Sequence, residues 1–317
     1  MTELIPAIPA DRIVAPPLRS VLFVPGHRDR WVGPARASGA DAVLFDLEDA
    51  VPIADLPAAR RIVRDTIDHY GAEGPRLMVR VAPPGSTDLR TDLDAIVAPG
   101  LHAVVLPLVQ GPDDVRRVEE QLAELESARG VEPGSIILVP LVETAFAARF
   151  SYEIAVSSRR VEYMGAGTSR QGDIARALGY RWSPEGLETL ALRSWVLLSV
   201  RAAGLRFPLT GLWGQVDDLE GCRRWVENAR DLGFSGTMAI HPSHIPIINE
   251  VFTPSAEEIA HWEQVIELMA QHQAEGIGAF VLDGKMIDEA DAKTAKLNLD
   301  IVRQLGAVRS PSSAPSA

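Results

Sequence analysis

Short apolar segments alternate with longer amphipathic segments through most of this 317-residue chain. The segment Ile136-Ile-Leu-Val-Pro-Leu-Val142 is largely β-branched and too short to cross a membrane, so it suits a strand buried on both faces. Such apolar runs lie at residues 20–24, 42–47, 77–81, 103–108, 136–142, 161–165, 206–212 and 236–240. The stretches between them have the length of the crossovers that parallel strands need. The pattern predicts an α/β fold, a TIM (β/α)8 barrel, with a doubly wound open sheet as the structural alternative.

Helical patterns occupy several of the connecting segments. The clearest are residues 56–70, 113–129, 184–203 and 217–232. Ser183 followed by Pro184 predicts an N-cap with proline at the first helical position. Gly130 and Gly233 stand where helix C-caps are expected. These signals support a regular alternation of strands and helices.

The pattern changes after His241. Ser255 and Glu258 have the spacing of a capping box, and the helix that they begin is expected to extend to about residue 274. A last helix is expected to end near residue 305. We therefore predict a barrel domain at residues 18–252 and a C-terminal helical appendage at 253–308 that packs on a neighbouring subunit. Prolines in residues 1–17 predict an extended arm, and the Pro/Ser-rich tail 309–317 is expected to be disordered.

Composition excludes some classes of protein. The formal net charge of −12 argues against non-specific binding to nucleic acid, which needs a basic face. The single cysteine, Cys222, excludes an internal disulfide framework and fits a reducing compartment. No stretch approaches the roughly 20 apolar residues of a spanning helix, and the N-terminus lacks the basic region of a signal peptide. We expect a cytoplasmic protein that binds neither membranes nor nucleic acid.

Charged side chains stand at the ends of the predicted strands, which converge on one mouth of a barrel. They are Asp46, Glu48 and Asp49 after the second run, Arg80 in the third, Glu143 after the fifth and Asp173 beyond the sixth. Crowded carboxylates resist ionisation unless a cation is present, and all-oxygen ligation indicates Mg²⁺ or Mn²⁺. We expect Glu143 and Asp173 to hold one such ion. The acids after the second run then orient metal-bound water, unless they cap a helix or pair with an arginine.

Arg80 presents a planar, permanently charged fork that suits bidentate capture of a substrate carboxylate. The alternative is an ion pair with one of the acids at the barrel mouth. His27 could assist proton transfer or face solvent, and His241, which precedes a proline, is expected to be structural and to donate to the backbone. Gly165, Gly167 and Gly172 allow the backbone to approach a ligand or metal-bound water closely, although their spacing fits no nucleotide-binding fingerprint.

Several ordered motifs together are more specific than any one of them. They are Arg19-Ser-Val-Leu-Phe-Val-Pro-Gly26, Gly39-Ala-Asp-Ala-Val-Leu-Phe-Asp46-Leu-Glu48-Asp49, Arg80-Val81, Leu141-Val-Glu143-Thr-Ala145, Gly233-Phe-Ser-Gly236, Ala239-Ile-His-Pro242, Ile248-Asn-Glu-Val-Phe-Thr-Pro-Ser255 and Asp283-Gly-Lys-Met-Ile-Asp288. Across residues 19–299 the chain resembles the citrate lyase β-subunit group of the HpcH/HpaI aldolase superfamily. The resemblance implies a magnesium-dependent TIM-barrel lyase that cleaves or forms a carbon–carbon bond next to a carbonyl. Members act on citryl-, malyl- or citramalyl-CoA and related thioesters, and they often assemble as trimers.

The resemblance also implies residue roles. By position, Glu143 and Asp173 match the metal ligands, and Arg80 matches the carboxylate-binding arginine. Asp288 matches an acid that in relatives reaches the site of a neighbouring subunit. Asp288, or a water oriented by Glu48 and Asp49, would move the proton. Further candidates for substrate binding are Pro107, Gly172 and Arg170.

The chain departs from the family pattern at three positions. It has Ala82 where the family usually has asparagine, and Leu108 and Thr237 where it usually or often has lysine. The loss of two cations near the mouth weakens the case for a CoA thioester with its phosphates. Arg170 or Arg28 could compensate for that loss.

The leading hypothesis is a magnesium-dependent carbon–carbon lyase that acts on a β-hydroxyacyl-CoA or a related hydroxy-oxo acid, in a homo-oligomer such as a trimer or hexamer. One alternative is a thioesterase, which would release CoA without cleaving a carbon–carbon bond. Another is an aldolase on free acids, which would be indifferent to CoA. From a different class, the chain could be a non-catalytic subunit that binds metal and acyl-CoA.

Overall fold

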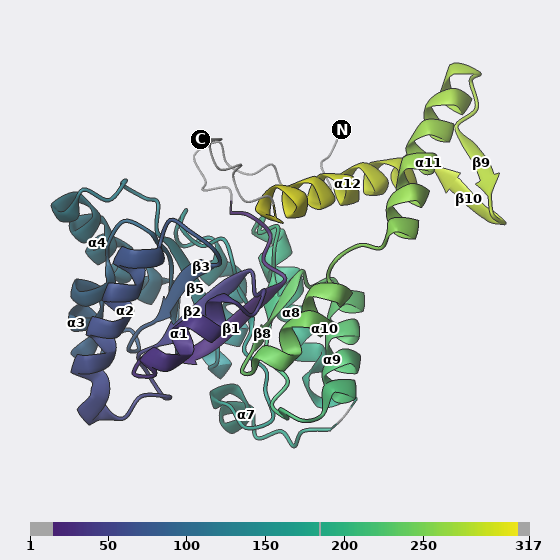
Figure 1. Ribbon diagram of the computed structural model, residues 1–317. Helices are drawn as coiled ribbons and strands as arrows, with labels where there is room; N and C mark the ends of the chain where they lie inside the picture. The colour runs from purple at the N-terminus through teal and green to yellow at the C-terminus, as the bar shows by residue number, and fades with distance from the viewer. Residues whose placement is uncertain (1–14, 184, 310–317) are drawn as a thin grey trace. The chain divides into compact units, whose positions relative to one another are not determined.

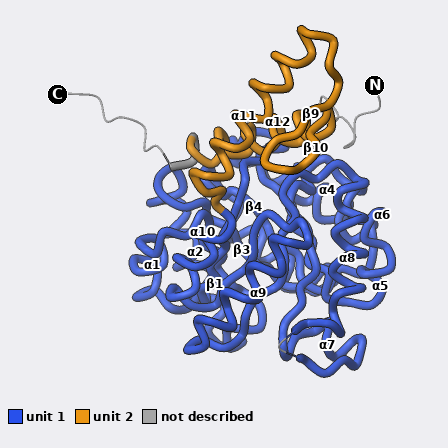
Figure 2. Tube along the Cα trace, turned by 90° about the vertical axis from the view of Figure 1, so that its right-hand side faces the viewer, with its two compact units in different colours: residues 1–252 blue, residues 253–317 orange. Residues whose placement is uncertain are grey.

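The structure, a computed structural model, describes residues 15–183 and 185–309. The chain divides into two compact units, residues 1–252 (unit 1) and residues 253–317 (unit 2), which Figure 2 shows in different colours. Most of the predicted N-terminal arm and nearly all of the predicted disordered tail lie outside the described residues. No helix in the described parts of the chain is long and apolar enough to span a membrane.

Unit 1 is a barrel of parallel strands (Figure 1). The strands are β1 (Ser20–Pro25), β2 (Ala42–Asp46), β3 (Arg76–Arg80), β4 (Leu101–Leu106), β5 (Ile137–Val142), β6 (Gly165–Ala166), β7 (Leu209–Thr210) and β8 (Gly236–Ala239). Their order is β6-β5-β4-β3-β2-β1-β8-β7. The backbone N–H of Leu209 donates to the Met164 carbonyl at 3.3 Å, which brings the two end strands together. The sheet is therefore a nearly closed TIM barrel, and the open-sheet alternative is excluded.

The meeting line of β6 and β7, which we call the seam, depends on a glycine. A Cβ added to Gly165 would lie 1.3 Å from the Leu209 carbonyl oxygen, so no other residue fits there without separating the two strands. Both strands are two residues long, shorter than the predicted runs at 161–165 and 206–212. The residues before β6 contribute only the isolated bridge between Val161 and Leu138.

Helices surround the strands in Figure 1. They are α1 (Asp29–Arg36), α2 (Leu56–Tyr70), α3 (Asp88–Ile96), α4 (Pro112–Arg129), α5 (Ala145–Arg149), α6 (Ser151–Ala155), α7 (Asp173–Leu178), α8 (Leu187–Ala202), α9 (Leu219–Leu232) and α10 (Ile245–Val251), with 3-10 turns at Ile53–Asp55 and Pro242–His244. Helix α2 shows how they pack, since its buried residues Ala59, Val63 and Ile67 recur every fourth position and join the core.

Helix ends test the capping predictions. Gly130 and Gly233 have φ angles of 67° and 106° and end α4 and α9 in the left-handed conformation, as predicted. The prediction that Ser183 caps α8 is wrong, because α8 begins at Leu187 after Gly186. Ser183 is instead held by Glu188, whose carboxylate accepts from the Ser183 N–H at 3.0 Å and from its hydroxyl at 2.5 Å.

Unit 2 has a small core of its own. Helix α11 (Ala256–Ala274) begins with the predicted capping box of Ser255 and Glu258. Strands β9 (Ala279–Leu282) and β10 (Lys285–Asp288) form an antiparallel hairpin, and α12 (Glu289–Arg309) follows. Val265, Met269, Ile287, Ala292 and Ala295 form the buried cluster.

Candidate active site

A cavity of about 750 Å³ lies at the carboxyl ends of the barrel strands. Its charged side chains are Asp46, Asp49, Arg80, Glu143, Asp173 and Arg176, a group that we call the charged wall. Apolar side chains from β1, β8 and α1, including Leu22, Val24, Met238 and Trp31, line another part of the cavity. This is the mouth where barrel enzymes place their catalytic residues.

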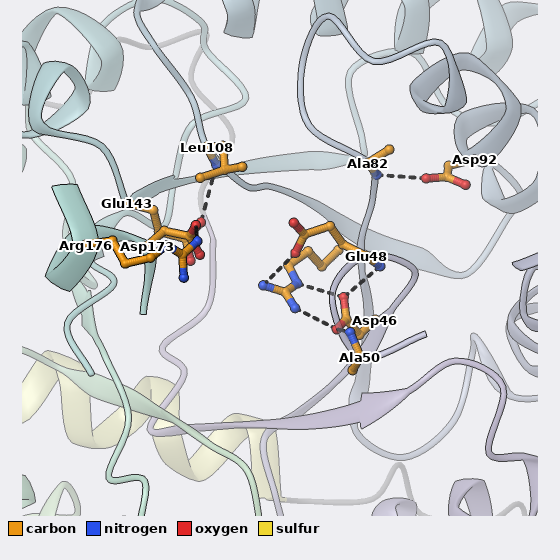
Figure 3. Close-up of polar contacts among 10 residues, drawn as sticks. Asp46, Glu48, Ala50, Ala82, Asp92, Leu108, Glu143, Asp173 and Arg176 are labelled. Carbon is orange, nitrogen blue, oxygen red and sulfur yellow. Dashed lines mark hydrogen bonds and ion pairs between the residues drawn. The ribbon is translucent and has the colours of Figure 1, made fainter. Parts of the chain in front are cut away.

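Arg80 is held in place by two acids of the β2–α2 connection. It is the register partner of Asp46 in the neighbouring strand. Its Nε and Nη2 donate to the two carboxylate oxygens of Asp46 at 2.7 and 2.6 Å, and Nη1 lies 3.0 Å from a Glu48 oxygen (Figure 3). Burial lowers the pKa of Arg80, but the hydrogen bonds and charge of Asp46 outweigh it and raise that pKa above the usual value. Arg80 therefore forms the ion pair with acids of the barrel mouth that was the alternative to substrate binding. It also lines the cavity.

Asp46 is the anchor of this arrangement. Its side chain is 2% exposed and also accepts the backbone N–H groups of Glu48 and Ala50, both at 3.0 Å. Asp46 thus fixes the turn after β2 as well as the arginine. Burial raises the pKa of Glu48 despite the opposing charge of Arg80, whereas Asp49 is exposed and lines the cavity.

Glu143 follows β5 directly and points to the same cavity. One of its oxygens accepts the backbone N–H of Leu108 at 3.3 Å. Burial raises the pKa of Glu143 to about 7, against the opposing charge of Arg80. Space for the side chain depends on Gly167, where an added Cβ would lie 2.9 Å from the Glu143 Cγ atom.

Asp173 is the first residue of α7, and its carboxylate pairs with Arg176 one turn later. Its negative charge contributes to the raised pKa of Glu143, so the two carboxylates are electrostatic neighbours. Figure 3 shows both side chains in the same region of the cavity, together with Arg176. Glu143 and Asp173 thus both line the barrel mouth, and that they hold one metal ion stays a prediction.

The donor set fits a hard divalent cation. The charged wall has four carboxylates and two guanidinium groups, an excess of two negative charges when all are ionised. Among the described residues, no group of three or more His, Cys, Asp or Glu side chains could hold a metal ion. Mg²⁺ is commonly held by one or two carboxylates, with water and substrate as the other ligands. Glu143 and Asp173 are the pair that could hold it here.

The other predicted site residues lie in different places. Gly172 lines the cavity, whereas the exposed Arg170 and the buried Pro107 are not part of its lining. Asp288 belongs to unit 2, where its carboxylate accepts the backbone N–H of Ala290 at the start of α12. The proposed roles of these residues stay predictions.

The three departures from the family pattern lie outside the cavity lining. Leu108 has a φ angle of 50°, unusual for a residue with a side chain, and offers its N–H to Glu143. Ala82 donates its N–H to the buried Asp92 at 2.8 Å. The Thr237 hydroxyl donates to the Gly211 carbonyl. All three residues thus make contacts within the fold, Ala82 and Leu108 through the backbone N–H and Thr237 through its hydroxyl.

The two histidines have contrasting surroundings. His241 lines the cavity, and its Nδ1 lies 2.8 Å from the Ser243 hydroxyl and accepts the Ser243 N–H at 3.3 Å. It therefore caps the following 3-10 turn as an acceptor, whereas the sequence predicted a donor to the backbone. His27 is partly buried, and its Nδ1 has no hydrogen-bond partner among the described residues.

Sequence reasoning missed Arg176 and Trp31, both of which line the cavity. Arg176 lies three positions after Asp173 on the same face of α7, but no cap in the sequence marks the start of that helix. Trp31 had no signal either, since the direction in which α1 leaves the barrel decides which of its residues reach the cavity.

Comparison with known proteins identifies the family of the chain. The model of the HpcH/HpaI aldolase/citrate lyase family matches residues 19–242. The chain is 30% identical to the citrate lyase subunit beta of Haemophilus influenzae over 282 residues, which cover 89% of this chain and 96% of that protein. It is 33% identical to a (3S)-malyl-CoA thioesterase of Cereibacter sphaeroides over 295 residues, which cover 93% of this chain and 98% of the relative.

Solved structures are similar as well. A crystal structure of the protein CitE from Mycobacterium tuberculosis, in complex with magnesium, acetoacetate and coenzyme A, aligns with a TM-score of 0.70 and 29% identity. The alignment covers 91% of this chain and 99% of that protein. A citrate lyase beta subunit from the same organism, complexed with oxaloacetate and magnesium, aligns with a TM-score of 0.60 and 30% identity over 76% of this chain and 98% of that one. From its barrel, its site and these matches, the chain belongs to the HpcH/HpaI aldolase/citrate lyase family.

Proposed function

We propose that this protein is a magnesium-dependent carbon–carbon lyase that acts on a β-hydroxyacyl-CoA, such as citramalyl-, malyl- or citryl-CoA, or on a related hydroxy-oxo acid. The observation that carries the proposal is the charged wall, where two neighbouring carboxylates, Glu143 and Asp173, face the same cavity as the fixed guanidinium of Arg80. Support comes from family membership and from the relatives whose structures contain magnesium with acetoacetate and coenzyme A, or with oxaloacetate.

Glu143 and Asp173 would hold Mg²⁺, or Mn²⁺ in its place. When bound, the cation would polarise the carbonyl of the oxo acid and stabilise the negative charge that develops next to it. Its positive charge would also offset the burial that raises the pKa of Glu143. These two acids therefore serve the reaction best in their ionised form.

Arg80 would bind the carboxylate of the substrate. Three of its nitrogen atoms contact Asp46 and Glu48, and a guanidinium has five N–H groups, so two remain for a ligand. Because those two acids fix the fork, the substrate would be held in one orientation next to the metal ligands. The apolar side chains of Leu22 and Met238 would exclude water from the other part of the cavity.

Proton transfer is assigned to acids near the cavity. Asp49 lies on the wall and is exposed, and Glu48 has a raised pKa, so either could orient a water that moves the proton. Asp288 would serve the same purpose from a second copy of the chain, with unit 2 packed on a neighbouring subunit of a homotrimer or hexamer. A cytoplasmic location also belongs to the proposal, supported by the single cysteine.

A thioesterase is the second candidate, because the chain is 33% identical to a (3S)-malyl-CoA thioesterase over almost its whole length. A CoA-independent aldolase is favoured by Leu108 and Thr237, which replace cations. The test incubates the protein and Mg²⁺ with a panel of β-hydroxyacyl-CoAs and free 4-hydroxy-2-oxo acids, and identifies the products by mass. Carbon–carbon cleavage supports the lyase, and free CoA with an intact acyl chain supports the thioesterase.

A variant connects the activity to the site. Glu143→Gln keeps the shape of the side chain and removes its charge, so we expect loss of Mg²⁺ binding and of turnover. Glu120→Gln, on the exposed surface of α4, is the matched control and should keep both. Full turnover by Glu143→Gln would contradict the metal assignment. Mg²⁺ and acyl-CoA binding without turnover on the whole panel would favour a non-catalytic binding subunit.

A further inference from the structure

The two arginines of the charged wall are held very differently. The Arg80 side chain is 11% exposed and contacts two acids through three nitrogen atoms. The Arg176 side chain is 73% exposed, and among the described residues the one carboxylate that it contacts is that of Asp173. Arg80 is fixed, whereas the charge of Arg176 lies mostly in solvent, so Arg176 can leave Asp173, whose side chain is 19% exposed, at a smaller cost than Arg80 can leave its acids.

The partner of Arg176 is a residue that the proposed function needs for another purpose. The guanidinium of Arg176 contacts a carboxylate oxygen of Asp173, one of the two acids that would hold the metal. A divalent cation on the same carboxylate would repel the guanidinium, since both are positive. Arg176 and the cation therefore compete for Asp173.

We propose that Arg176 is a displaceable counter-ion. It neutralises Asp173 while the two acids have no cation, and it turns to the anionic group of the substrate once the cation binds. This inference rests on the proposed function and adds a second anion-binding residue to it. Because the cation releases Arg176, cation binding would favour substrate binding.

The charges of the wall support this exchange. Without a cation, the wall has an excess of two negative charges when all of its groups are ionised, and that excess repels an anionic substrate. A divalent cation cancels that excess. Arg176, once released from Asp173, is then available to an anionic group of the substrate. Its long side chain starts from α7 at the cavity lining, so a ligand that reaches Asp173 lies within its range.

A purely structural explanation is that the pair stabilises the first turn of α7. A pair three residues apart supports a helix only weakly, and an equivalent pair, Asp113 and Arg116, begins α4. That second pair is exposed on both sides and serves as the matched control. If Arg176 only stabilised α7, removing it would leave the Mg²⁺ affinity unchanged or reduce it.

The first experiment titrates Mg²⁺ alone into the intact protein by calorimetry, comparing the wild type with Arg176→Gln and Arg116→Gln. We expect Arg176→Gln to bind Mg²⁺ about 2- to 5-fold more tightly, the range that corresponds to the loss of an exposed ion pair. Arg116→Gln should match the wild type. Unchanged or weaker Mg²⁺ binding by Arg176→Gln would overturn the inference and leave the proposed function intact, whereas a wild type that binds no Mg²⁺ would overturn both.

The second experiment titrates oxaloacetate, which has a 2-oxo acid and a second carboxylate, at saturating Mg²⁺. Arg176→Gln should bind it more weakly, by about 10-fold or more, because a charge-assisted hydrogen bond is lost. Arg176→Lys keeps the charge and should recover part of that affinity, which a role limited to α7 does not require. Equal affinity of Arg176→Gln and the wild type for oxaloacetate would refute the second half of the exchange.

Discussion

Replacing Asp46 with asparagine tests whether one buried carboxylate organises the barrel mouth. In the wild type, one carboxylate oxygen accepts from the Glu48 N–H and Arg80 Nε, and the other accepts from the Ala50 N–H and Arg80 Nη2. The asparagine side chain has one acceptor oxygen and an amide nitrogen that only donates. Whichever way the amide turns, its nitrogen replaces one of the two accepting oxygens, so two of the four hydrogen bonds are lost. The amide N–H groups then face two other donors, one from the backbone and one from Arg80.

The size of the effect follows from those contacts. One lost hydrogen bond involves the guanidinium and costs about 1.5–3 kcal/mol, and the lost backbone hydrogen bond adds about 0.5–1.5 kcal/mol. Breaking a buried ion pair by removing one partner costs about 3–5 kcal/mol, which agrees with that sum. Both side chains are largely buried, so little of the interaction is screened by solvent. We expect Asp46→Asn to lower the free energy of unfolding by about 3 kcal/mol, and the melting temperature by about 6–12 °C.

Urea unfolding of the wild type and Asp46→Asn, with comparison of their m-values, measures the change. Asp113→Asn is the control, because the Asp113 side chain is 76% exposed and its one ion pair should contribute less than about 0.5 kcal/mol. In the activity assay, Asp46→Asn should lower kcat/KM by about 100-fold, since Arg80 is no longer fixed. A loss of stability below about 1 kcal/mol with an unchanged m-value would refute the anchoring role of Asp46.

Two further predictions concern the barrel itself. Gly165→Ala places a Cβ 1.3 Å from the Leu209 carbonyl oxygen and should cost about 3 kcal/mol or more in urea unfolding, since the seam must separate. The buried Nε2 of His102 has no hydrogen-bond partner in the described parts of the chain, and burial lowers the pKa of His102 from 6.5 to about 3. Between about pH 3 and pH 6.5 the unfolded state therefore binds a proton at His102 that the folded state does not bind. The contribution of His102 to the free energy of unfolding is complete above about pH 6.5, and it falls by about 1.4 kcal/mol per pH unit as the pH decreases towards 3. His102→Gln should lose less stability than the wild type between pH 6.5 and pH 5.

These two predictions have their own controls. Gly33→Ala lies in α1, and no atom beyond its chain neighbours and its own helix backbone lies within 4 Å of the added Cβ, so it should cost far less stability than Gly165→Ala. A stable Gly165→Ala protein would show that the seam does not need close contact. His69→Gln is the control for pH, as His69 lies on the exposed part of α2. Equal pH dependence of His102→Gln and the wild type would contradict the role of His102.

The barrel could be predicted because its signals are local. The apolar runs of β1 to β5 and the helical pattern of residues 56–70, which α2 matches at both ends, follow from residues close together in the chain. The predicted lengths of β6 and β7 were too great, because apolar residues next to these strands pack in the core without forming ladder hydrogen bonds. Ser183 shows the other limit, since its contact with Glu188 competes with a cap that the local sequence favours.

The site could be predicted only as a set of strand ends. That Glu143 and Asp173 share one cavity follows from barrel topology, which brings the carboxyl ends of all strands to one mouth. The partners of Arg80 did not follow, because the register between β2 and β3 decides that Asp46 lies beside it. The pairing of Arg176 depends on α7 beginning at Asp173, and no cap in the sequence marks that start.

The seam has a consequence for how the mouth responds to ligands. Strands β6 and β7 have two residues each, and the loop with Asp173 begins directly after β6. Segments with few ladder hydrogen bonds open locally at a small free energy, far below that of global unfolding. Amide hydrogens near the seam should therefore exchange with solvent faster than those of β2 and β3. We therefore expect the side of the barrel that fixes Arg80 to stay in place when an ion arrives, and the side that supplies Asp173 to adjust.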